Sequence, residues 1–145
     1  MDNQEALFQK IVLFTAAVHQ VTHDISKDIR PTDITPVQYR ILEYIAVGQP
    51  VTLSQISECQ NMSMPNTSRE LKKLCEKQIC EKFTDPTDRR KQYIRLTSKG
   101  TVVMNEVFAQ IHNRLQQRLE GASQAKINEI SDALTLLQNT IFRIE

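Results

Sequence analysis

A short polar segment in the middle of the chain, residues 85–91, concentrates the side chains best suited to binding a polyanion. Its sequence is Asp-Pro-Thr-Asp-Arg-Arg-Lys, so that Arg89, Arg90 and Lys91 stand side by side. Pro86 and the aspartates have the preferences expected of a turn. Cationic groups on such a turn have no apolar core to stabilise, and the segment is therefore typical of a surface that binds phosphates.

The residues on either side of this segment have the pattern of two strands. Residues 79–84 and 92–97 are rich in β-branched and aromatic side chains. In the second stretch, Ile94 and Leu96 alternate with more polar neighbours, as in a strand with one buried face. The pattern predicts a β-hairpin with the three cations at its tip.

A helix is predicted just before this hairpin, over residues 63–77. Ser63 is a suitable N-cap, and Pro65 is tolerated because it falls in the first turn. Thr67, Leu71 and Leu74 recur at steps of four and three and should face the core.

The opposite side of the same helix carries groups that could contact duplex DNA. Asparagine can bond adenine with two hydrogen bonds and arginine can do so with guanine, so Asn66 and Arg69 are the expected base readers. Hydroxyl and ammonium groups, and the amino end of the helix, would bond phosphate. Together with the tip of the hairpin, this helix supplies the residues expected to contact DNA. They are Ser63, Pro65, Asn66, Ser68, Arg69, Lys72, Lys73, Asp88, Arg89, Arg90 and Lys91.

The distribution of charge agrees with this expectation. The chain of 145 residues has a formal net charge of only +1. Residues 53–100, however, hold ten Lys and Arg against six acidic residues, and the rest of the chain holds eight against eleven. A basic centre between acidic flanks is expected where one segment meets phosphate.

Capping signals predict two further helices ahead of the recognition helix. Thr35 and Gln38 form a capping box for a helix over residues 36–47, and Thr52 and Gln55 form another for a helix ending near Gln60. A turn at Asn61 and Met62 would then complete a helix-turn-helix.

Long amphipathic helices are predicted at both ends of the chain. Apolar residues recur at steps of three and four over residues 3–30, from about residue 98 to 119, and, after a break at 121–123, from Ile127 to Ile144. These stripes could fold back within one copy or form a helical dimer interface, and the dimer is favoured because the central unit has few apolar residues left to cover them.

Several other classes of protein are disfavoured. No signal peptide or membrane-spanning segment is legible, and three cysteines without a CxxC pair argue against a disulfide framework, so a cytoplasmic protein is expected. No nucleophilic triad or glycine-rich phosphate loop indicates an enzyme. His19 and His23 have the i, i+4 spacing of metal ligands, and with His112 they leave a metal sensor as an alternative, although no metal or cofactor is predicted.

Three motifs in the same order resemble the multiple antibiotic resistance regulator (MarR) family of bacterial transcription factors. They are residues 35–42, residues 63–69, and residues 85–90 followed by 96–100. The chain departs from the family pattern at Gln60, where an apolar residue is usual, and at Gln78, where glycine usually ends the recognition helix. It also lacks the cysteine that oxidant-sensing members carry in the first helix.

The resemblance implies a fold that is mainly α with a small β-hairpin wing. Residues 1–34 and 101–145 would form a helical dimerisation region, and residues 35–100 a winged helix-turn-helix lobe, within a single domain. It further implies a homodimeric regulator that binds a palindromic operator and responds to a small-molecule effector. A repressor is favoured over an activator. Asp88 would orient Arg90, with Arg89 or Lys91 at the backbone; which arginine enters the minor groove stays open.

Two alternatives to this function remain. One is a helical interaction dimer that modulates another regulator without binding DNA. The other is a regulator that senses metal through its histidines or oxidants through Cys59, Cys75 or Cys80. For Cys75 and Cys80, a role as small apolar core residues is the favoured interpretation.

Overall fold

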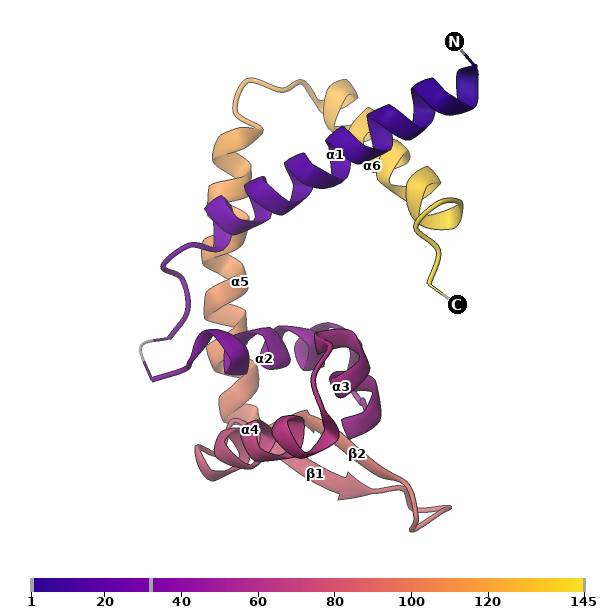
Figure 1. The fold of residues 1–145 in the computed structure, drawn as a ribbon. Coiled ribbons are helices and arrows are strands. Elements are labelled where there is room, and N and C mark those ends of the chain that lie inside the picture. Colours follow the sequence, from indigo (N-terminus) through magenta and orange to yellow (C-terminus); the bar gives the residue numbers. More distant parts are fainter. Residues whose placement is uncertain (1, 32, 145) are drawn as a thin grey trace. The chain divides into compact units, whose positions relative to one another are not determined.

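A computed structural model describes residues 2–31 and 33–144 of the chain (Figure 1). Within these residues, six helices and two strands follow one another, and the mainly helical fold with one hairpin is as predicted. Their bounds are α1 Asn3–Ser26, α2 Pro36–Gly48, α3 Leu53–Gln60, α4 Met64–Glu76, β1 Cys80–Thr84, β2 Gln92–Leu96, α5 Ser98–Arg118 and α6 Gln124–Asn139.

The chain divides into two compact units, which are described separately. The first runs to Ile111 and contains α1 to α4, the hairpin and most of α5. The second begins at His112 and contains the end of α5 and all of α6. None of the helices in the described part of the chain is long and apolar enough to cross a membrane.

A single apolar core holds α2, α3, α4, the hairpin and the beginning of α5 together. Figure 1 shows α3 and α4 forming the helix-turn-helix, with β1 and β2 beside α4. Each of these elements places at least one aliphatic or sulfur-containing side chain in the core. Its buried members are Ile34, Ile41, Leu42, Ile45, Val51, Ile56, Leu71, Leu74, Ile79, Cys80, Ile94, Leu96 and Met104.

Both predicted capping boxes are present and set the beginnings of α2 and α3. The Thr35 hydroxyl accepts from the Gln38 backbone N–H while the Gln38 side chain accepts from the Thr35 N–H, and Thr52 and Gln55 repeat the arrangement. Asn61 ends α3 in the left-handed conformation, with φ 53°, a conformation that asparagine adopts more readily than most residues. The predicted turn between the two helices is therefore confirmed.

The hairpin is antiparallel and pairs Cys80 with Leu96 and Phe83 with Tyr93. Ile94 and Leu96 are buried, as their alternation predicted. A feature that the sequence did not indicate is a third short pairing, in which Val51 exchanges two backbone hydrogen bonds with Ile94. The base of the wing is consequently fixed to the segment between α2 and α3.

The two terminal helices are shorter than their apolar stripes. α1 ends at Ser26 and not near residue 30, because Asp28 takes φ 65°, which a right-handed helix cannot contain. The hydroxyl of Ser26 also donates to the carbonyl of Thr22, a side-chain bond common where helices bend or end. The stripe of α6 continues to Ile144, but the helix ends at Asn139.

The apolar faces of α1 and α6 are open to solvent within this chain. No residue of α1 or α6, both fully described, is buried. The exposed large apolar side chains on these helices are Leu7, Phe8, Val12, Leu13, Phe14, Val18, Ile127, Ile130, Leu134 and Leu136. Apolar surface on this scale is rare on a monomer and marks a surface that another molecule covers.

Candidate nucleic-acid interface

The α4 helix is anchored by its buried side so that its other side faces solvent. The Ser63 hydroxyl accepts from the Asn66 backbone N–H and caps the helix, as predicted. Thr67, Leu71 and Leu74 are fully buried, and the Thr67 hydroxyl donates to the Ser63 carbonyl at 2.9 Å. The rotation of α4 about its own axis is therefore determined by three core residues and one cap.

The exposed side of α4 presents the residues expected to read DNA. Asn66 and Arg69 lie one turn apart at the start of the helix, and Arg69 Nη1 is 3.5 Å from Asn66 Oδ1. Ser68 is the exception to full exposure, because it is half-buried toward the wing. The solvent-exposed members of the predicted set on or capping this helix are Ser63, Pro65, Asn66, Arg69, Lys72 and Lys73.

A polar contact that the sequence did not indicate connects α4 to α2. Gln38 is 3% exposed, and its Nε2 donates to Glu70 Oε2 at 3.1 Å. Lys77 Nζ donates to Gln38 Oε1 at 3.3 Å and also to the carbonyl of Asp33. One amide thus closes the α2 capping box and contacts the middle and the C-terminal end of α4; only the first of these roles can be recognised from spacing.

The junction between α4 and β1 contains one of the departures from the family pattern. Gln78 has φ 62°, the left-handed conformation that glycine adopts without steric cost. The turn is nevertheless completed, since the Gln78 N–H donates to Cys75 O and the Ile79 N–H to Leu74 O. The other departure, Gln60, is half-buried and donates to the carbonyl of Arg40 at 3.4 Å. Both departures are accommodated locally.

The beginning of α5 supports the same junction from the other side. The Thr97 hydroxyl donates to the Gln78 carbonyl at 2.6 Å, and Lys99 Nζ donates to the Lys77 carbonyl at 3.1 Å. Gly100 approaches so closely that a Cβ there would lie 2.1 Å from the carbonyl oxygen of Ile79. Only glycine permits this contact, which explains its place in the motif at residues 96–100.

Two aspartates organise the tip of the wing. Asp85 Oδ1 accepts from the backbone N–H and the hydroxyl of Thr87, at 2.9 and 2.8 Å. These hydrogen bonds hold the pKa of the Asp85 carboxyl below its usual value. The Arg90 guanidinium, followed by the Arg90 backbone N–H, likewise lowers the pKa of Asp88. Both carboxylates are therefore ionised, as hydrogen-bond acceptors within the loop.

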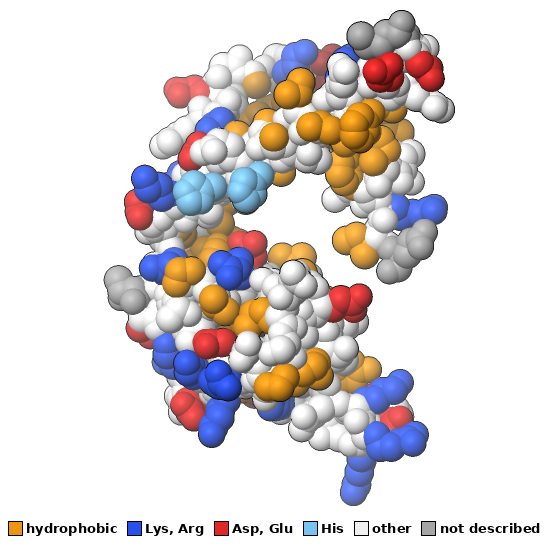
Figure 2. Space-filling model, in the orientation of Figure 1, with side chains coloured by type: hydrophobic (Ala, Val, Ile, Leu, Met, Phe, Trp, Pro, Cys, Tyr) orange, Lys and Arg blue, Asp and Glu red, His pale blue; other side chains and the backbone are white. Residues whose placement is uncertain are grey.

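The predicted contact between Asp88 and Arg90 is present. Arg90 Nε donates to Asp88 Oδ1 at 3.1 Å, and Nη2 lies 3.4 Å from Oδ2. The Arg90 side chain is nevertheless 92% exposed, so that it is oriented without being sequestered. Arg89 and Lys91 are exposed beside it. Figure 2 shows the resulting group of Lys and Arg side chains at the hairpin tip, with further basic side chains over α4.

An aromatic and charged cluster stiffens the outer face of the hairpin. The rings of Phe83 and Tyr93 stack with centroids 5.8 Å apart, and the Arg95 guanidinium lies 4.1 Å above the Phe83 ring. Arg95 Nε also donates to Glu81 Oε1 at 2.9 Å. Since these four residues form cross-strand pairs, they give the arm that carries Arg90 a defined direction.

The histidines and cysteines considered for metal or thiol chemistry do not gather at one site in the described part of the chain. His19, His23 and His112 are all exposed, and within residues 2–31 and 33–144 no three metal-binding side chains come together. Cys59 is exposed on α3, whereas Cys80 belongs to the core and Cys75 packs against it half-buried. The predicted packing role of the last two is confirmed.

Comparison with known proteins agrees with the resemblance to the MarR family. The model of the MarR family matches residues 32–91, which extend from the approach to α2 to the wing tip. The HTH-type transcriptional regulator YdgG of Bacillus subtilis is 25% identical over 142 residues, covering 94% of this chain and 93% of the relative. Escherichia coli MarR, the multiple antibiotic resistance protein, is 23% identical over 123 residues, covering 82% and 85%. The chain is thus similar to MarR family proteins, most specifically over its winged helix-turn-helix.

Solved structures establish the same winged-helix fold. A MarR family protein from Bacillus stearothermophilus is 21% identical, with 99% of both chains covered and a TM-score of 0.73. The structure of S. aureus MepR bound to ethidium bromide is 21% identical, with a TM-score of 0.64 over 90% of this chain and 94% of MepR. The curated relatives are transcription regulators, and the likeness supports a regulator and not an enzyme.

Proposed function

We propose that this MarR-like protein is a homodimeric repressor that binds a palindromic operator. The observation that carries the proposal is the arrangement of α4 and the wing. The capped helix α4, whose orientation about its axis is fixed by its core residues, exposes Asn66 and Arg69. From the adjacent hairpin projects Arg90, which is held by Asp88. Two such lobes would place their α4 helices in successive major grooves, about one helical turn apart.

Each residue of the interface has a role that follows from its chemistry. Asn66 and Arg69 would bond base edges, and each bidentate contact would contribute roughly 1–3 kcal/mol of discrimination. Arg90, held by Asp88, would enter the minor groove, where a narrow groove deepens the negative potential. Pro65 would lie at the groove edge beside the base readers. The residues proposed to contact phosphates are Ser63, Ser68, Lys72, Lys73, Arg89 and Lys91.

The open apolar faces support the dimer. We assign residues 1–34 and 101–145 to the dimerisation region and residues 35–100 to the DNA-binding lobe. Phe8 and Leu13 of α1 are 65% and 71% exposed, and Leu136 of α6 is 64% exposed. A second copy is the simplest partner that covers all these stripes, since identical helices present matching apolar faces.

The proposed regulation is a population shift between dimers that fit the operator and dimers that do not. A small molecule that binds one arrangement better than the other would change DNA affinity by its differential binding free energy. The structural neighbour S. aureus MepR is bound to ethidium bromide, a small organic molecule. For this chain the effector would be a small organic molecule.

Footprinting on the protein's own promoter region tests the operator directly. The proposal predicts protection of a palindromic site with two half-sites about one helical turn apart. Sedimentation of the free protein should give the mass of two chains. A protein that dimerises but protects no site on this or any other promoter fragment would instead be an interaction dimer that acts without DNA.

A further inference from the structure

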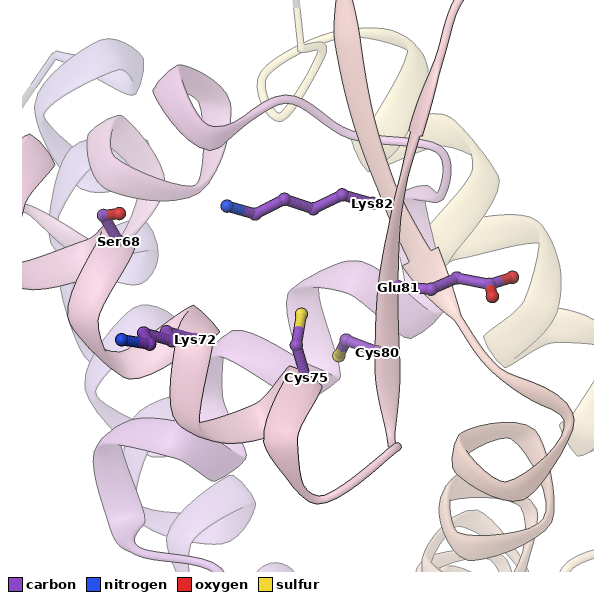
Figure 3. Close-up of a pocket in the computed structure, with 6 residues that line it drawn as sticks. All are labelled: Ser68, Lys72, Cys75, Cys80, Glu81 and Lys82. Carbon is purple, nitrogen blue, oxygen red and sulfur yellow. The ribbon is translucent and has the colours of Figure 1, made fainter.

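A pocket of about 440 Å³ lies between helix α4 and the first strand of the wing. The residues that line it, drawn in Figure 3, are Ser68, Lys72, Cys75, Cys80, Glu81 and Lys82. Ser68 and Lys72 belong to the residues expected to contact DNA, whereas Lys82, on β1, does not. The pocket therefore adds to the interface a lysine that the sequence did not indicate.

Lys82 reaches over the pocket without a partner in the protein. Figure 3 shows its side chain extending from β1 across the opening toward α4. Lys82 and Lys72 are both exposed, and within residues 2–31 and 33–144 neither ammonium group forms a hydrogen bond or an ion pair. Two cations at one opening repel each other unless an anion lies between them. The pocket is therefore suited to an anion.

The Ser68 hydroxyl supplies a further donor at the same place. Ser68 is half-buried, yet its hydroxyl forms no hydrogen bond within the described part of the chain. The hydroxyls of Ser57 and Thr67, by contrast, donate to the carbonyls of Leu53 and Ser63, each four residues earlier. The Ser68 hydroxyl thus remains available to an acceptor from outside the chain.

No negative charge among the residues that line the pocket, all of them described, faces its opening. Glu81 points the other way in Figure 3, and its Oε1 accepts from Arg95 Nε at 2.9 Å. Burial raises the pKa of the Cys75 thiol and raises that of Cys80 to about 12, so that both sulfurs are uncharged at neutral pH. The lining thus combines two cations and a hydroxyl with neutral sulfurs.

The place of the pocket between helix and wing indicates which anion it would meet. In the proposed complex α4 enters the major groove, and Arg90 enters the minor groove beside it. One sugar-phosphate strand separates two neighbouring grooves of a duplex. That strand must therefore pass between α4 and the wing, the two elements that form the walls of the pocket.

We propose that Lys82, together with Lys72 and Ser68, binds one phosphate of the strand that separates the two grooves. The ammonium groups pair with the anionic oxygens of this phosphate, and the Ser68 hydroxyl donates to one of them. Because α4 and β1 both supply donors to the same phosphate, the contact fixes the register of helix and wing on the duplex. Lys82 is thus a positioning residue without base specificity. This inference rests on the proposed function.

Operators with single methylphosphonates test the inference one phosphate at a time. In each duplex one phosphate of a half-site is replaced by an uncharged methylphosphonate, and its affinity is compared with that of the unmodified operator. At the phosphate between the major groove of the half-site and the flanking minor groove, the loss should be roughly fivefold smaller for Lys82→Gln than for the parent protein. This difference is the effect of one charge at about 4 Å in water. At phosphates elsewhere, the two proteins should lose affinity equally.

Two further variants separate a phosphate contact from a general loss of charge. Lys10→Gln is the matched control, because it removes the same charge from an exposed position on α1, outside residues 35–100. Lys82→Arg retains the positive charge. Both should reproduce the pattern of the parent, and circular dichroism should show the same helix content for all variants. Equal losses for Lys82→Gln and the parent at every phosphate would overturn the inference and leave the proposed function standing.

The salt dependence of operator affinity distinguishes a failure of this inference from a failure of the proposed function. Lys82→Gln should reduce the slope of log K against log salt by about 1 for each bound lobe, whereas Lys10→Gln should not change it. A slope for Lys82→Gln equal to that of the parent would contradict the inference alone. A parent protein that bound no duplex at any salt concentration would refute the proposed function and this inference with it.

Discussion

The Nε2 amide of Gln38 in α2 donates a hydrogen bond to Oε2 of Glu70 in α4, across 32 positions of sequence. The same side chain closes the capping box of Thr35 and accepts from Lys77. The helix that carries the proposed base readers is thus held by a buried polar group as well as by its apolar core.

Replacing Gln38 by methionine should destabilise the lobe by roughly 1–3 kcal/mol, because three groups lose a hydrogen-bond partner. The matched control is Gln55→Met, which removes only a capping-box bond at an exposed position and should cost about 0.5–1 kcal/mol. Chemical denaturation measures both. Equal losses in the two variants would mean that the contacts with Glu70 and Lys77 contribute nothing.

Gly100→Ala should destabilise the lobe by about 1–3 kcal/mol, the usual cost of overpacking. Its Cβ would lie 2.1 Å from the backbone oxygen of Ile79, which cannot move away without disturbing the α4–β1 turn. In Gly48→Ala, by contrast, the added Cβ meets a Val51 methyl at 3.4 Å, an ordinary contact. Thermal unfolding should therefore show a lower Tm for the first variant and little change for the second.

Local features of the fold were predictable because their signals lie within a few residues. The Thr-x-x-Gln capping boxes at Thr35 and Thr52 and the alternation of Ile94 and Leu96 each determine local structure almost unaided. The buried side of α4 follows from its apolar spacing. The contact between Asp88 and Arg90, two residues apart, was equally predictable once the resemblance to the family's wing was recognised.

Contacts between distant segments were not predictable from one sequence. Nothing in the spacing of Gln38 and Glu70, or of Val51 and Ile94, indicates that they meet. The end of α1 at Ser26 was misjudged because the apolar stripe continues through Ile29, which is buried although it lies outside the helix. Apolar periodicity reports which side chains need burial and not where the backbone stops being helical.

Arg90→Ala should weaken operator binding about tenfold to a hundredfold, through the loss of a minor-groove cation. Asp88→Ala should weaken it only about twofold to fivefold, since an exposed ion pair restrains its arginine modestly. Arg89→Ala decides which arginine enters the groove. If it has the larger effect, Arg89 is the inserted residue and the braced Arg90 contacts the backbone. Fluorescence anisotropy with a labelled operator gives all three affinities.

The wing loop should lose its order in acid. The pKa values of Asp85 and Asp88 are lowered in the folded loop, so their stabilising hydrogen bonds are complete above the ordinary carboxyl pKa of about 4 and are lost as the pH falls through the lower values. Amide resonances of Thr87 and Arg90 should therefore be constant from pH 7 to about 5 and shift below that range. In Asp88→Asn the transition at Arg90 should disappear. Its persistence would assign the transition to another group.

The central claim is that α4 reads bases while lysines and arginines hold phosphates, and operator affinity measured against salt concentration tests it most directly. For the parent protein, log K should fall steeply with log salt, and Lys73→Ala should reduce the slope by about 1. Asn66→Ala with Arg69→Ala should abolish the preference for operator over scrambled DNA and leave binding salt-dependent. A parent protein with no salt dependence, or a double variant that still prefers the operator, would contradict the account.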